Sequence, residues 1–279
     1  MNNSFKYDNI KTFLHQPFFL FMFLGLLGCE TDESQTVTTF NTLIMADEFD
    51  TEGAPNPSLW NYDIGRGPNN DGWGNQELQY YTDRPENIRV QNGFLLITAK
   101  EESFEGSNYT SARILTKGLF EQQYGRFEAR IRLPYGKGYW PAFWLLGSNI
   151  DEVGWPQCGE IDVMENAGAS PTVVSSAVHG PGYNAGLAIT KKYDFENERV
   201  DTKFHIYGIE WSPGNINFYV DDVLYNTITP EDVTGEWVFD NGSFYILLNL
   251  AVGGVFDGPP NAETVFPQTM VVDYVRVYR

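Results

Sequence analysis

Segment 160–165 carries three acidic side chains, Glu160, Asp162 and Glu165, separated by apolar residues. A solvated strand face would place polar residues beside its acids, so acids in this apolar setting require a chemical explanation. In a glycosidase, one carboxylate attacks an anomeric carbon while a second, kept protonated, gives its proton to the leaving oxygen and later activates water. The segment therefore indicates a glycosidase site, with a cation site or a structural acid cluster as alternatives.

Strand geometry decides whether the three acids meet. In a regular strand Glu160 and Asp162 share one face and Glu165 points to the other. A β-bulge with Met164 as the inserted residue brings Glu165 to the shared face. Asp162 can then hydrogen-bond Glu160 and help to keep one carboxyl protonated near neutral pH. Retaining enzymes need a carboxyl separation of about 5–5.5 Å and inverting ones about 6.5–9.5 Å, and spacing alone leaves both open.

Aromatic residues make up 15% of the chain, and several of them cluster around Trp140 and Trp144. These two residues are an even number of positions apart, so in a strand they lie on the same face, where flat apolar rings can stack on sugars. Since aromatic clusters usually belong to a core, composition leaves a sugar platform and a core position equally open.

The elements that position these residues are short and alternate in polarity. From residue 41 onward, such segments recur between Gly, Pro, Asn and Asp clusters, which predicts an antiparallel all-β domain. Segment 126–133 alternates without a break, Asp221-Asp222 indicates a two-residue hairpin turn, and 244–252 is apolar enough for a fully buried strand. Two packed antiparallel sheets leave one face free to curve into a groove.

The N-terminal region differs from the rest. Lys6 and Lys11 precede an apolar run at 18–27, which is typical of a signal peptide and shorter than the roughly 20 residues of a membrane span. The run closes on Cys29 in a sequence that resembles a lipobox, so we predict lipidation of Cys29, with a plain cleaved signal as the alternative. The predicted parts are a signal over 1–28, a flexible acidic tether over 29–42 and one domain over 43–279. This organisation predicts an exported bacterial lipoprotein of the outer membrane or cell surface, held at the membrane only by its lipid.

Composition argues against several classes of function. The net charge of −19 disfavours nucleic acid and sulfated polysaccharide as partners. Cys158 is the only thiol besides Cys29, so no intramolecular disulfide forms if Cys29 is lipidated or removed. Beyond the signal only His179 and His205 remain, which excludes a multi-His metal site.

Segment 160–165 resembles the signature of glycoside hydrolase family 16 in its laminarinase-like branch. The resemblance extends over 43–279, and the segments that carry it in the same order are 72–81, 109–114, 124–128, 140–146 and 179–180. It implies a β-jelly-roll sandwich of two curved antiparallel sheets with a concave substrate cleft. It also implies a retaining endo-β-1,3-glucanase in which Glu160 is the nucleophile, Asp162 its helper and Glu165 the acid/base.

The same resemblance implies further site residues. Those expected to bind substrate are the sugar platforms Trp140, Trp144 and Trp155 and the polar contacts Asn75, Arg113 and His179. For His179 a structural histidine, and for Arg113 a salt bridge under the sheet, are the alternatives. Many family members also bind calcium away from the chemistry, and the matching oxygens here belong to Glu48, the carbonyl of Gly93 and Asp273. Exposed acids without a metal are the alternative, and the chemistry itself requires no cofactor.

The expected partner is a laminarin-like β-glucan, acted on by a monomer. The nearest competing functions are a mixed-linkage β-1,3-1,4-glucanase, an agarase or a carrageenase on the same scaffold. The Trp-rich segment and the acidic surface favour a neutral glucan over a sulfated galactan. A non-catalytic carbohydrate-binding protein is the alternative of another class, and the intact acid triad argues against it because a pure binder needs no nucleophile.

Overall fold

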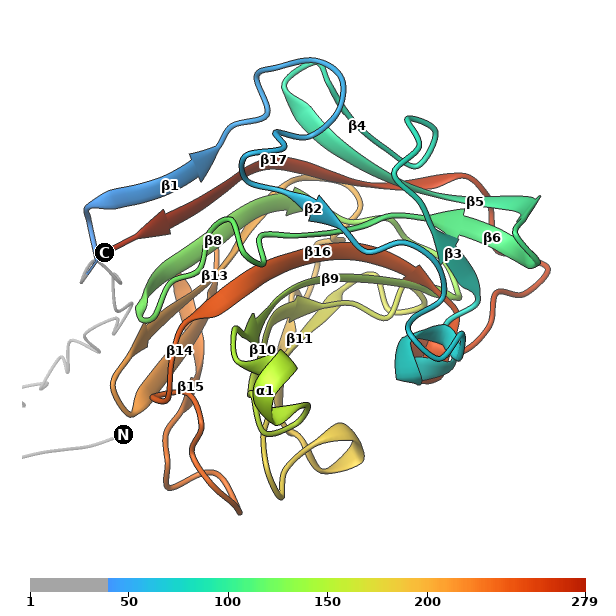
Figure 1. Ribbon diagram of the computed structural model, residues 1–279. Helices are drawn as coiled ribbons and strands as arrows, with labels where there is room; N and C mark the ends of the chain where they lie inside the picture. The colour runs from blue at the N-terminus through green and yellow to red at the C-terminus, as the bar shows by residue number, and fades with distance from the viewer. Residues whose placement is uncertain (1–39) are drawn as a thin grey trace, which may run out of the picture. The chain divides into compact units, whose positions relative to one another are not determined.

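The structure is a computed structural model that describes residues 40–279. The predicted signal, Cys29 and nearly all of the tether lie outside the described residues. Within 40–279 the chain forms two stacked, curved sheets, and Figure 1 shows them bending in the same sense. The predicted all-β sandwich of two curved antiparallel sheets is confirmed. No helix in this part of the chain is long and apolar enough to cross a membrane.

The larger sheet has ten strands and forms the outer layer. Its order is β15 (Val223–Ile228), β14 (Asn215–Val220), β13 (His205–Ser212), β8 (Gly125–Arg132), β17 (Gln268–Tyr278), β5 (Phe94–Phe104), β6 (Ser107–Ser111) and β3 (Gln79–Tyr81). Two more strands pair with inner strands of this order, β1 (Leu43–Asp47) with β17 and β4 (Ile88–Gln91) with β5. Neighbouring strands are antiparallel except for the β3–β6 pair.

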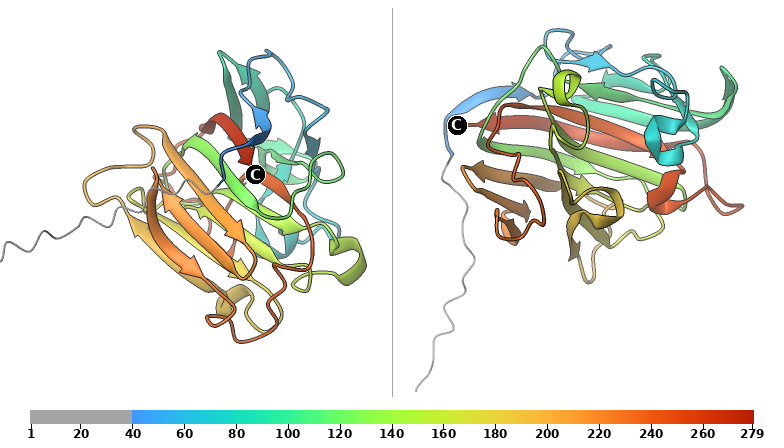
Figure 2. Two further views of the ribbon diagram at one scale, coloured as in Figure 1. Left: turned by 90° about the vertical axis from the view of Figure 1, so that its left-hand side faces the viewer. Right: turned by 60° about the horizontal axis from the view of Figure 1, so that its bottom comes forward.

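The second sheet has seven strands, all paired antiparallel. Their order is β12 (Ile189–Asp194), β11 (Val173–His179), β10 (Glu160–Glu165), β9 (Tyr139–Gly147), β16 (Phe244–Val252), β7 (Arg113–Leu115) and β2 (Asn61–Tyr62). Four short helical turns connect strands: η1 (Gly72–Gln76), α1 (Ile150–Val153), η2 (Ala185–Leu187) and α2 (Gly254–Asp257). Figure 2 shows η1 and α2 side by side at one end of this sheet.

The core lies between the sheets and follows the alternation of the strands. In β8, Phe127, Ala129 and Ile131 are fully buried, because strand side chains point alternately to opposite faces. Every residue of β16 is buried, as its apolar sequence predicts. The predicted hairpin turn is also confirmed: Asp221 and Asp222 have φ values of 49° and 66°, and the turn joins β14 to β15.

Candidate active site

The free face of the seven-stranded sheet carries a cleft of about 550 Å³. On β9 the cleft side is formed by residues of one parity, Trp140, Ala142, Trp144 and Leu146. Strand pairing places Asp162 opposite Trp144 and Glu165 opposite Ala142. All nine residues predicted to bind or cleave substrate line this cleft: Asn75, Arg113, Trp140, Trp144, Trp155, Glu160, Asp162, Glu165 and His179.

A β-bulge in β10 brings the three acids to one face. Against β9, Asp162 pairs with Trp144 and Met164 pairs with the next residue, Phe143, so Val163 has no partner of its own. The predicted bulge is confirmed, whereas the prediction that Met164 is the inserted residue is wrong. Both Val163 and Met164 are buried apolar side chains, so polarity could not show which of them is extra.

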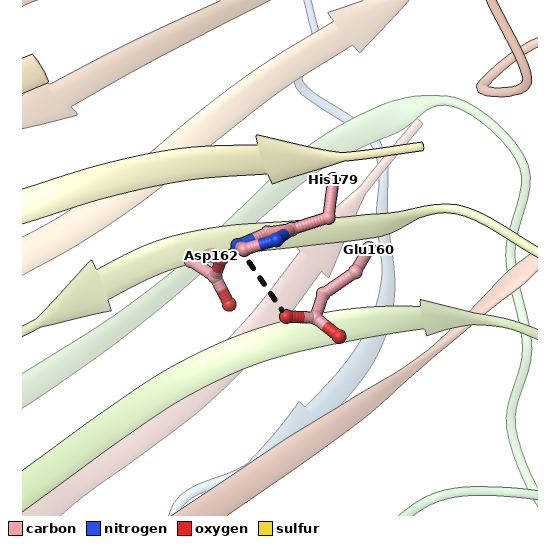
Figure 3. A group of neighbouring side chains, drawn as sticks. All are labelled: Glu160, Asp162 and His179. Carbon is pink, nitrogen blue, oxygen red and sulfur yellow. Dashed lines mark ion pairs between the residues drawn. The ribbon is translucent and has the colours of Figure 1, made fainter. Parts of the chain in front are cut away.

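His179 joins the acids from the neighbouring strand. Strand β11 places it opposite Glu160, and Figure 3 shows its ring reaching toward both Glu160 and Asp162. Its Nε2 lies 3.0 Å from Asp162 Oδ2 and 3.7 Å from Glu160 Oε1. The other nitrogen, Nδ1, accepts the Ala185 N–H at 3.1 Å. A neutral imidazole carries one proton, so with Nδ1 accepting a hydrogen bond that proton is on Nε2, the nitrogen nearer the carboxylates.

Two indole groups each hold one oxygen of a glutamate. Trp155 Nε1 donates to Glu160 Oε2 at 2.9 Å, and Trp140 Nε1 donates to Glu165 Oε1 at 2.8 Å. Trp155 is 43% exposed, so its ring borders the open cleft. Each glutamate keeps its second oxygen for other partners.

Burial dominates the electrostatics of the acids. It raises the pKa of Glu160, Asp162 and Glu165 each to about 8, and for both glutamates the neighbouring charge of Asp162 adds to this effect. The nearby His179 opposes the rise for Glu160, and the Trp140 hydrogen bond opposes it for Glu165. Burial of the three carboxyls in one site therefore favours the protonated form of an acid near neutral pH, which a proton donor requires.

For Arg113 the sequence left two roles open, a substrate contact and a structural salt bridge. The structure shows a salt bridge and also places the residue in the cleft wall. Its Nε lies 2.9 Å from Asp63 Oδ2. Its guanidinium carbon is 4.7 Å from the ring centres of both Trp73 and Trp144, an arrangement of two cation–π contacts. The guanidinium is thus fixed as part of the cleft wall.

The cleft residues that were not predicted include Glu77, Asn249 and Phe256. Glu77 is buried and accepts hydrogen bonds from Asn75 Nδ2 at 3.3 Å and Gln79 Nε2 at 2.6 Å. Asn249 Oδ1 accepts the Trp144 indole N–H at 2.8 Å. A lone Asn in the apolar segment 244–252 was a signal that could have identified it. Phe256, on α2, is the third, and no sequence pattern distinguishes it.

The predicted calcium ligands lie on the other sheet. Strand β8 occupies one edge of β17, and β5 and β1 follow one another along the other edge. The pairing of β5 ends with Leu95 opposite Val272 and that of β1 with Asp47 opposite Val275, so Glu48, Gly93 and Asp273 come to the same stretch of β17. Their oxygens are of the kind that calcium prefers. Both carboxylates are nevertheless paired: Glu48 accepts from Arg276 at 2.7 and 2.9 Å, and Asp273 pairs with Arg130.

A cation site was also an alternative for the acid cluster. Among residues 40–279, one group of His, Cys, Asp and Glu side chains has ligand atoms close enough for an ion, namely Glu160, Asp162 and His179, within 4.8 Å of one another. His179 Nδ1, however, accepts the Ala185 N–H, so a neutral ring carries its proton on Nε2. Neither nitrogen offers a lone pair to a metal, so the geometry favours proton chemistry.

Comparison with known proteins points to one family. Residues 75–276 match the profile described as "Glycosyl hydrolases family 16". A β-glucanase of Rhodothermus marinus is 43% identical over 272 residues, 93% of each chain. The laminarinase catalytic domain of Thermotoga maritima MSB8 superimposes with a TM-score of 0.81 at 46% identity, covering 85% of this chain and 98% of that one. An endo-β-1,3-glucanase of Pyrococcus furiosus gives the same TM-score and identity, covering 87% and 98%.

Proposed function

The chain belongs to glycosyl hydrolases family 16, and from this premise we propose that it is a retaining endo-β-1,3-glucanase acting on laminarin-like β-glucan. One observation carries the proposal: the bulge in β10 sets Glu160 and Glu165 on one cleft face with Asp162 between them. A carbohydrate-binding protein would need sugar platforms but no pair of carboxyls aligned in this way. The relatives reported above are glucanases, in agreement with this reading.

In the first step Glu160 acts as the nucleophile. Its carboxylate attacks the anomeric carbon while Glu165 gives its proton to the glycosidic oxygen, so the carbon–oxygen bond breaks and a covalent glycosyl-enzyme forms. In the second step the Glu165 carboxylate takes a proton from water, the water oxygen attacks the anomeric carbon, and Glu160 leaves as a carboxylate. Both steps invert the anomeric carbon, so configuration is retained overall.

Asp162 and His179 support the nucleophile. His179 Nε2 lies 3.0 Å from Asp162 Oδ2 and 3.7 Å from Glu160 Oε1. An imidazole at this distance stabilises negative charge on these carboxyls, as a nucleophilic Glu160 requires. The charge of Asp162 raises the pKa of both glutamates. The position of His179 beside Glu160 thus supports Glu160 as the nucleophile.

The substrate panel of laminarin, lichenan, agarose and carrageenan tests the proposal. We expect reducing-sugar release from laminarin above the other three, and an initial product with the β configuration by proton NMR. Preferential hydrolysis of lichenan would instead indicate a mixed-linkage glucanase, and binding of laminarin without any release would indicate a non-catalytic protein. The Glu160→Gln variant, assayed beside the wild type, controls for a contaminating hydrolase.

Calcium binding by Glu48, the Gly93 carbonyl and Asp273 is part of the proposal as a structural site. It requires calcium to displace Arg276 and Arg130 from the two carboxylates. All three ligands lie on the ten-stranded sheet or its turns, whereas the acids lie on the other sheet. The ion would therefore affect stability, with no part in the chemistry.

We also propose that the enzyme is an exported monomer anchored through lipidated Cys29. The support is the sequence pattern at 1–29 alone, since these residues lie outside the described part of the chain. A lipid on a flexible tether would hold the enzyme at the membrane while leaving the cleft free to meet a polymer.

A further inference from the structure

Helix α2 brings an exposed aromatic ring against one of the cleft tryptophans. Phe256 and Trp140 are stacked with ring centres 5.1 Å apart and an interplanar angle of 23°. Phe256 is 38% exposed, and both rings line the cleft. The stacking fixes the plane of the indole, because offset ring pairs have a preferred geometry.

The helix itself is held firmly in this position. Asp257 is buried, and its Oδ2 accepts the Gly138 N–H at 2.6 Å while Oδ1 lies 3.3 Å from Lys137 Nζ. Gly254 has φ +82°, and a Cβ at this position would lie 3.0 Å from the Trp140 ring. The backbone of α2 therefore lies against the indole with little room for a side chain at residue 254, and the positive φ also favours glycine there.

The indole so held donates its N–H to Glu165 Oε1 at 2.8 Å. In a neutral carboxyl group one oxygen carries the proton and the other is the stronger acceptor. An oxygen engaged by an N–H donor is thus the carbonyl oxygen, and the proton resides on Oε2. We propose that Trp140, held by α2 through Phe256, is a positioning residue that places the acidic proton on Oε2 of Glu165. This inference rests on the proposed role of Glu165 as the acid/base.

The charged surroundings of Glu165 do not come from the elements that hold Trp140. Acidic and basic groups near it are Asp162 and Glu160 on its own strand and His179 on β11. Strands β9 and β16 contain no Asp, Glu, Lys, Arg or His, and Asp257 on α2 is paired with Lys137. The Trp140 N–H is accordingly the hydrogen bond that favours the charged form of Glu165, and its loss should raise the pKa of this carboxyl.

The test compares Trp140→Phe with a matched control on the same strand face. Trp140→Phe keeps an aromatic ring against Phe256 but removes the N–H. We expect hydrolysis of laminarin to fall about tenfold, the effect of losing roughly 1.4 kcal/mol. An aryl β-laminaribioside with a 2,4-dinitrophenolate leaving group, which needs no proton, should change much less. The alkaline limb of kcat/KM for laminarin should move about half to one pH unit upward.

The control variant is Trp144→Phe, which removes an N–H that donates to Asn249 and to no carboxyl. It should lower the rates on both substrates by similar factors and leave the alkaline limb in place. Phe256→Ala should move the limb in the same direction as Trp140→Phe by a smaller amount. Circular dichroism of each variant establishes that it is folded.

Three results would overturn the inference. Equal losses on laminarin and the aryl substrate in Trp140→Phe would show that the indole only binds sugar. An alkaline limb that does not move in Trp140→Phe would show that the indole N–H does not act on Glu165. A limb that moves in Trp140→Phe but not in Phe256→Ala would show that α2 does not hold the indole in place. If Glu165→Ala hydrolyses laminarin normally, the proposed function itself fails; if Glu165→Ala behaves as an acid/base variant, only the role of Trp140 is at stake.

Discussion

The buried carboxyl of Glu165 should cost the folded protein stability at neutral pH. Burial raises its pKa to about 8 in the folded chain, against about 4.3 in an unfolded one. Between these values the folded state binds more protons than the unfolded state, so the free energy of unfolding falls as pH rises. The stability contributed by the protonated form is complete below the unfolded pKa and is lost as pH rises through the folded pKa. Glu165→Gln does not titrate and should escape this loss.

The gain in the free energy of unfolding expected for Glu165→Gln follows from the difference between the folded and unfolded pKa of Glu165. A pKa difference of about 3.7 for an isolated group corresponds to about 5 kcal/mol, at 1.36 kcal/mol for each pH unit. This is an upper bound, since Asp162 contributes to the rise and is still present in the variant. The substituted amide keeps an oxygen that can accept the Trp140 N–H, so we expect a gain of about 2 kcal/mol near pH 8. For a domain of this size that equals roughly 4–8 °C in Tm.

The assay is a pair of thermal melts near pH 8 and near pH 4 in chelator-free buffer. Glu165→Gln should melt above the wild type near pH 8 and level with it near pH 4. The matched control is Glu263→Gln, an exposed acid in a loop, which should not differ from the wild type at either pH. If Glu165→Gln is no more stable than the wild type near pH 8, or is equally stabilised near pH 4, the buried charge of Glu165 does not destabilise the folded protein as argued.

The proposed mechanism and the two untested sites lead to further predictions. Glu160→Gln should fold and bind laminarin while turnover falls by several orders of magnitude, because only the attacking oxygen is lost; substantial residual activity would contradict the nucleophile assignment. Glu165→Ala should lose far more rate on laminarin than on substrates with good leaving groups, and azide should restore rate by replacing water; equal losses on both would exclude it as the acid/base. Removal of calcium with a chelator should lower Tm without changing the products, because the ion binds only the folded state, and Asp273→Ala should abolish this dependence; a wild-type Tm that does not respond would count against the site. Cys29→Ser should shift the enzyme from the membrane to the soluble fraction with unchanged kinetic constants, and a wild type that is soluble without detergent would argue against the anchor.

Much of the fold and the acid cluster could be predicted because they depend on local rules. Strand parity placed Trp140 and Trp144 on one face, and an odd spacing between Asp162 and Glu165 required a bulge. Which residue is inserted depends on the register with β9, where Met164 pairs with Phe143. Register is set by partners far away in sequence, so it was not readable within the segment.

The residues missed by sequence reasoning owe their roles to tertiary contacts. Phe256 acts through a ring on a strand more than a hundred positions away, and no periodicity encodes such a pair. The arginine partners of Glu48 and Asp273 likewise come from β17 and β8. A sequence shows which carboxylates are present, but it does not show whether each one pairs with an arginine or binds a metal ion, since both neutralise its charge.

The setting of Arg113 has a consequence for how the enzyme meets its substrate in different salt concentrations. It is the only lysine or arginine among the described residues that line the cleft, and it is enclosed by two indoles and paired with Asp63. Mobile ions screen exposed charges within about 10 Å at 0.1 M salt but affect enclosed pairs far less. A neutral glucan also feels no long-range steering from the surface charge. The association rate with laminarin should therefore be nearly independent of ionic strength, despite the net charge of −19 carried by the chain.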